Sequence, residues 1–214
     1  GNGNVVTIER QTEDYEGIEV GGFYEVELAD GPEGKITLTG EDNILEYIDT
    51  EVKGGTLTIR SKKNMSLNPS RGEKVHITVP VEKIDAIRLS GSGKLVGKKT
   101  LKSDRFKVHT SGSRNTELSL DANSVTIISS GSSNVLLNGT SESTTITSSG
   151  SSNVKAFEFV SDKVNIRSSG SSNVRITANE TIDSRSSGSS NVKYRGNPGK
   201  VYSKASGSGK VSKD

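Results

Sequence analysis

The tripeptide Ser-Gly-Ser recurs through the second half of this 214-residue chain at nearly constant spacing. Its central glycines are Gly91, Gly112, Gly131, Gly150, Gly170, Gly188 and Gly207. The repeat length of about 18–21 residues is too short for one copy to bury an apolar face alone, so each copy must stack on its neighbours. The chain is therefore expected to fold as a solenoid.

Within each copy, apolar and small residues alternate with polar ones. Four positions before the glycine stand Ile87, Val108, Ile127, Ile146 and Ile166. A period of two is typical of β-strands, and it predicts two short strands on either side of each bend. We therefore predict an all-β chain, a right-handed parallel β-helix (β-solenoid) with coils about 4.8 Å apart. The alternative is a β-sandwich or propeller, although propeller blades need about 40–50 residues.

An asparagine follows the glycine by three positions in five of the copies. These residues are Asn115, Asn134, Asn153, Asn173 and Asn191. Stacked coils would place them in one column, where each side-chain amide can bond to the next, as in cross-β assemblies. The glycine itself permits a positive φ or a close approach between coils. The sequence thus predicts a structural asparagine ladder beside the bend.

Charge and serine content divide the chain near residue 90. Residues 1–89 hold ten Lys and Arg against seventeen Asp and Glu, whereas residues 90–214 hold eighteen against nine. We interpret residues 1–89 as acidic, irregular β coils that cap the stack, and residues 90–214 as the basic, regular β-helix. Both are expected to form one continuous structural unit.

The basic residues are scattered along the second part, and no aromatic residues alternate with them. This pattern favours a role in solubility and in protecting strand edges over a polyanion partner. We expect no nucleic-acid partner. No run of about 18 apolar residues occurs, so we also expect no transmembrane span.

The N-terminal part contains one sign of the same repeat, in the apolar spacing around Gly22. An early coil is therefore expected to begin near Tyr15. The 69 residues from Gly22 to Gly91 leave room for roughly three irregular coils. A short helical turn is expected within residues 41–47, and a loop is expected over residues 62–72.

Signals for catalysis are weak. The two histidines, His76 and His109, are far apart in sequence and fit exposed strand positions. A serine nucleophile needs an adjacent base, and none is evident. Some polysaccharide-acting enzymes, such as pectinases, are β-helices, but their clustered carboxylates have no counterpart in these repeats. We predict no enzymatic activity, no catalytic residues, no cofactor and no metal site.

The serines that flank the glycines have the parity of outward-facing residues, and they form the candidate binding site. They are Ser130, Ser132, Ser149, Ser151, Ser169, Ser171, Ser187 and Ser189. Stacking would give a flat grid of hydroxyls with a repeat of about 4.8 Å, which suits a regular ligand such as a glycan. The alternative is that small hydroxyls suit a tight corner and bond to the local backbone.

Three segments of the first part resemble the putative auto-transporter adhesin, head GIN domain family. They are Ile18–Leu28, Thr39–Ile48 and Gly54–Ile59, and the later Ser-Gly-Ser-Ser-Asn-Val copies are similar to the family's C-terminal repeats. The resemblance implies an exported β-helical protein of Bacteroidetes, in the cell envelope as an outer-membrane lipoprotein, periplasmic or surface-exposed. It implies a non-enzymatic adhesin that binds a glycan or another host or envelope component, with a lipid anchor preceding residue 1. The alternatives are a polysaccharide-acting enzyme and a lipid- or envelope-component-binding scaffold.

Overall fold

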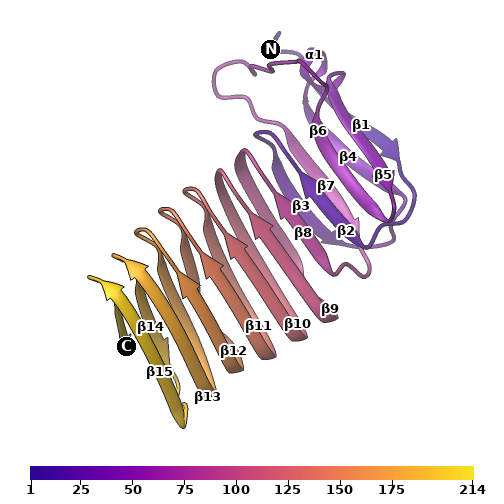
Figure 1. The fold of residues 1–214 in the computed structure, drawn as a ribbon. Helices are drawn as coiled ribbons and strands as arrows, with labels where there is room; N and C mark the ends of the chain where they lie inside the picture. Colours follow the sequence, from indigo (N-terminus) through magenta and orange to yellow (C-terminus); the bar gives the residue numbers. More distant parts are fainter.

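The computed structural model describes all residues from 1 to 214, and β-strands dominate it (Figure 1). The N-terminal elements are β1 (Val5–Gln11), β2 (Gly17–Val20), β3 (Glu25–Asp30), β4 (Lys35–Glu41), α1 (Asp42–Leu45), β5 (Ile48–Lys53), β6 (Thr56–Ser61), β7 (His76–Val81) and β8 (Ala86–Leu89). The repeats form β9 (Ser92–Thr110), β10 (Ser113–Ser129), β11 (Asn134–Ser148), β12 (Asn153–Ser168), β13 (Asn173–Gly188), β14 (Asn191–Arg195), β15 (Lys200–Gly207) and β16 (Lys210–Lys213). No helix is long enough to cross a membrane.

The repeats stack as parallel coils, which confirms the predicted β-helix. Each long strand from β10 to β13 is nearly one whole coil, and it pairs in parallel with the coils before and after it. Equivalent residues are partners: Ile127 pairs with Ile146, and Ile146 pairs with Ile166. All three isoleucines are fully buried. Like residues therefore form columns along the solenoid, as Figure 1 shows for the strands.

Bend glycines allow the coils to approach one another closely. Gly131, Gly150 and Gly170 have φ values of 70–74°. A Cβ atom on Gly150 would lie 2.6 Å from the carbonyl oxygen of Gly131 in the preceding coil. Both the backbone conformation and the contact exclude a larger side chain, because a non-glycine residue is strained in the left-handed region. This contact explains why glycine recurs at every bend.

Serine fills part of the interior on both sides of the bend. Ser133, Ser152, Ser172 and Ser190, two positions after each glycine, are fully buried. Each hydroxyl donates to the backbone carbonyl three residues earlier, as Ser152 Oγ does to Ser149 O at 2.8 Å. These bonds satisfy polar groups inside the bend. Serine therefore takes the place of apolar residues in this part of the interior.

The N-terminal part is built differently from the expected three irregular coils. The predicted early coil is present, since β2 and β3 flank Gly22 and pair in parallel with β8 and β9. On its other side, β6 and β7 pair in parallel with β2 and β3 and form one further coil. The expectation of three coils is wrong, because β1, β4 and β5 pair antiparallel to their neighbours.

The antiparallel strands lie at one end of the solenoid, where they extend the sheet beyond its outermost coil (Figure 1). Such an arrangement blunts the exposed edge of the stack. The loop between β6 and β7 takes the place of the tight bend, and the expected helical turn is α1. The coil around Gly22 comes first in the sequence, but it is second along the solenoid, because the coil of β6 and β7 lies outside it.

Arg114 occupies the position where the following bends have a buried serine. Its side chain is fully buried, and its guanidinium donates to the carbonyl oxygens of Ser90 at 3.1 Å, Tyr24 at 2.9 Å and Gly22 at 3.1 Å. Burial lowers the pKa of Arg114 to about 10. The arginine therefore joins the first regular repeats to the irregular coil around Gly22.

Candidate ligand-binding face

The bend serines predicted as binding residues lie in two columns, separated by the glycine column. Their backbone N–H groups bond to the preceding coil: Ser149 donates to Ser129 O at 2.9 Å, and Ser151 donates to Gly131 O at 2.8 Å. Their hydroxyls make no hydrogen bond to another protein group. The local bonds expected of a serine-rich corner are made instead by the buried serines such as Ser152. The flanking hydroxyls are thus available to solvent or a ligand.

Asparagine side chains form a continuous ladder on the strands that follow the bend. Asn134 Nδ2 donates to Asn115 Oδ1, Asn153 to Asn134 and Asn173 to Asn153, each at 3.0 Å. The last rung, from Asn191 to Asn173, measures 3.5 Å. Because the amides bond to one another, this column is mainly structural, as in stacked amide ladders.

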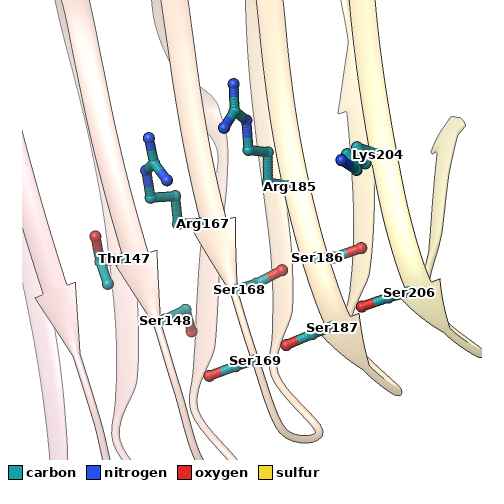
Figure 2. A pocket seen from close by; sticks show the side chains of 10 residues that line it. All are labelled: Thr147, Ser148, Arg167, Ser168, Ser169, Arg185, Ser186, Ser187, Lys204 and Ser206. Carbon is teal, nitrogen blue, oxygen red and sulfur yellow. The ribbon is translucent and has the colours of Figure 1, made fainter.

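One open hollow of about 390 Å³ lies on the strands that precede the bends (Figure 2). Ten residues from neighbouring coils line it, and none is apolar: Thr147, Ser148, Arg167, Ser168, Ser169, Arg185, Ser186, Ser187, Lys204 and Ser206. Of the eight predicted serines, this hollow brings together Ser169 and Ser187. The serines that follow the glycine do not line it.

Three cations of the hollow form what we call the cation column: Arg167, Arg185 and Lys204. They pair in register through β12, β13 and β15, so each lies one coil from the next. These three basic residues, although scattered in the sequence, therefore lie next to one another on the surface. Their common position, three residues before each glycine, is the sequence signal that could have revealed the column.

Most of the cation column is free of carboxylate partners. Arg185 Nε lies 3.9 Å from Asp183 Oδ1, while no carboxylate lies within 4.0 Å of the charged groups of Arg167 and Lys204. The hollow contains no acidic residue and no histidine. It can bind an anion through charge and hydroxyl groups.

The hollow at Glu25, Glu27 and His76 is the place where a carbohydrate-cleaving pair of carboxylates could be sought. Both glutamates lie on β3, two residues apart, so they stand side by side on one face instead of opposing each other. Glu25 is also paired with Lys74 and lies 3.4 Å from His76 Nδ1. This arrangement does not resemble two carboxylates flanking a scissile bond.

The hollow of the cation column has no apolar lining residue of the kind that a lipid-binding groove needs. The exposed large hydrophobic residues are distributed over several elements: Val5, Met65, Leu136, Val201 and Tyr202. Tyr202 and Val201 lie next to each other on β15, and together with Arg185 and Lys204 they line a second hollow beside the cation column. The geometry of this region favours a charged, hydroxylated ligand over an acyl chain.

Comparison with known proteins agrees with this fold. Residues 14–198 match the family described as putative auto-transporter adhesin, head GIN domain. A putative adhesin from Bacteroides fragilis is 24% identical, with a TM-score of 0.88 over 100% of this chain and 98% of that one. A putative lipid binding protein from Parabacteroides distasonis is 25% identical, with a TM-score of 0.77 over the same shares. No curated protein is detectably similar in sequence.

Proposed function

Because the chain belongs to the putative auto-transporter adhesin, head GIN domain family, we propose that it is a non-enzymatic, exported binding protein of the bacterial cell envelope. Its ligand is a glycan, bound along the flat edge where the Ser-Gly-Ser bends stack. A lipid anchor preceding residue 1 would hold it at the outer membrane. Its partner is then a component of the envelope or of a host surface.

The observation that carries this proposal is the array of free hydroxyls. The eight flanking serines repeat at the coil spacing of about 4.8 Å, and their backbone groups are held by neighbouring coils. A rigid array costs little ordering entropy when a ligand binds, because its groups are already in place. Small hydroxyls also exchange hydrogen bonds readily with the hydroxyls of a sugar.

A glycan array probed with the purified protein tests the proposal, followed by titration of the best-retained glycan. Replacing Ser169 and Ser187 together by valine should weaken binding by about tenfold, since two hydrogen bonds of about 0.5–1.5 kcal/mol are lost. The matched control replaces Ser124 and Ser143, which also stack in register but lie away from the bends and outside the array. An array without any retained glycan, or equal affinity in the Ser169/Ser187 variant, contradicts the proposal.

A further inference from the structure

The strands that precede the bends carry further basic residues outside the hollow. Beside the cation column, Lys163 and Lys200 both pair with Thr181 of β13, and both are exposed. The carboxylates near these residues are Asp183, beside Arg185, and Asp162 and Glu180, which directly precede Lys163 and Thr181. Arg167, Arg185 and Lys204 themselves lie over three successive coils with one acid, Asp183, beside them. Cations held this close together repel one another, and an anionic ligand relieves that repulsion.

A row of hydroxyls runs parallel to the cation column. Ser169, Ser187 and Ser206 stand two residues after Arg167, Arg185 and Lys204, so they lie on the same side of their strands. Figure 2 shows the two rows crossing neighbouring coils, with the serine row nearer the bends. Each of these three coils therefore presents one cation and one bend serine on the same side of its strand to the hollow. The pattern repeats along the solenoid axis with the coil spacing of about 4.8 Å.

We infer that this hollow binds an acidic polysaccharide, a linear glycan that carries carboxylate or sulfate groups. The inference rests on the proposed function and specifies its ligand class. The acidic groups would lie on the cation column, and Arg167 and Arg185 would bind them with paired N–H donors. The sugar hydroxyls would bond to Ser169, Ser187 and Ser206, and the chain would run along the solenoid axis.

Other polyanions fit the hollow less well. Single-stranded nucleic acids bind on aromatic side chains that stack with the bases, and no aromatic residue lines this hollow. A membrane surface would also need inserted apolar groups, and the lining residues are all polar.

The test compares polygalacturonate and heparin with neutral dextran by isothermal titration calorimetry at two salt concentrations. The wild-type protein should bind an acidic polymer, more weakly at higher salt, and should not retain dextran. Replacing Arg167, Arg185 and Lys204 together by glutamine should weaken binding by about tenfold, because three exposed ion pairs with the polymer are lost.

The matched control replaces Lys155, Arg175 and Lys193 by glutamine. These residues also lie in register over three coils, beside the asparagine ladder, so the net charge changes equally. The control should keep its affinity within about twofold. Equal losses in the two variants would show diffuse attraction by net charge and would overturn the inference.

Two further probes complete the experiment. Oligo-dT and phosphatidylglycerol vesicles should bind more weakly than the acidic glycan, and tighter binding of either one overturns the inference. Retention of a neutral glycan that depends on Ser169 and Ser187 but not on the three cations would also overturn it. That last result would leave the proposed glycan-binding function standing, whereas no glycan binding at all would contradict both.

Discussion

At the residue scale, Arg114 shows how a repeat can be modified at its junction. A buried guanidinium is costly unless its N–H groups are bonded. Here three backbone carbonyls from two earlier coils accept from it, and Tyr24 and Gly22 belong to the irregular first coil. The same position holds a small serine in later coils, because those bends stack on identical bends. Arg114 thus joins unlike coils.

Replacing Arg114 by serine tests this role. The substitution leaves three buried carbonyls with fewer partners and creates a cavity, so we expect a loss of about 3 kcal/mol in the free energy of unfolding. Denaturant unfolding would measure the loss. The control, Arg71→Ser, concerns an exposed arginine and should stay within about 0.5 kcal/mol of the wild type. Equal stability of the two variants would contradict a structural role for Arg114.

The surroundings of His109 should lower the pKa of its side chain. Burial lowers its pKa, and the nearby charges of Arg88 and Lys107 lower it further. NMR titration should therefore give a value below the usual one, about 6.5, and Arg88→Gln should raise it. An unchanged or lower value in Arg88→Gln would contradict the assignment.

The same shift makes stability depend on pH in a defined direction. The unfolded chain takes up a proton on His109 at higher pH than the folded chain does. Stability is therefore lost as the pH falls from about 6.5 through the lower pKa of the folded state. The dependence should be smaller in His109→Gln, as measured by unfolding at pH 7.5 and 5. An identical pH dependence in the two proteins would show that His109 does not contribute.

At the scale of elements, the asparagine ladder joins neighbouring coils outside the core. A central rung takes part in two bonds: Asn153 donates to Asn134 and accepts from Asn173. The terminal Asn115 accepts one bond, from Asn134. The contribution of each rung should therefore follow its place in the ladder.

Alanine substitution of these rungs measures the difference. At about 1 kcal/mol for each net hydrogen bond, Asn153→Ala should lose about 2 kcal/mol and Asn115→Ala about 1 kcal/mol. Chemical denaturation of both variants under identical conditions gives the comparison. A larger loss at Asn115 than at Asn153 would show that backbone pairing, and not the amide ladder, dominates at these positions.

At the scale of the whole molecule, stability is distributed along one axis. Each coil contacts chiefly the coils on either side, so the solenoid behaves as a chain of nearest-neighbour interfaces. The N-terminal end is extended by antiparallel strands, whereas every residue of β15 is exposed. The two ends should therefore open with different free energies.

Amide hydrogen exchange would reveal this gradient. In the 214-residue protein, β15 and β16 should exchange fastest among the strands, and β10 to β12 should be the most protected, since opening them requires breaking two interfaces. Mass spectrometry of peptic fragments would resolve the coils. Uniform protection from β10 to β16 would indicate a single cooperative unit and contradict the nearest-neighbour description.

Much of this architecture could be predicted from the repeat. The spacing of the glycines predicts the coil length, the period of two predicts the strands, and stacking predicts the columns at Ile127 and Asn134. The order of the N-terminal coils could not be predicted, because antiparallel pairing of β1, β4 and β5 depends on contacts between segments without a repeat. Arg114 breaks the repeat, but its partners are more than 20 residues away.

Part of the candidate site could likewise be predicted from the sequence, and part of it could not. The amino-acid order alone determined that serines flank each bend and that their side chains face outward, because parity along a strand is a local property. Only the tertiary structure decided that Arg167, Arg185 and Lys204 are neighbours. They are 18 and 19 residues apart in sequence, and stacking in register places each one a single coil from the next. Local chemistry follows from sequence, whereas a charged surface requires the register that brings distant residues together.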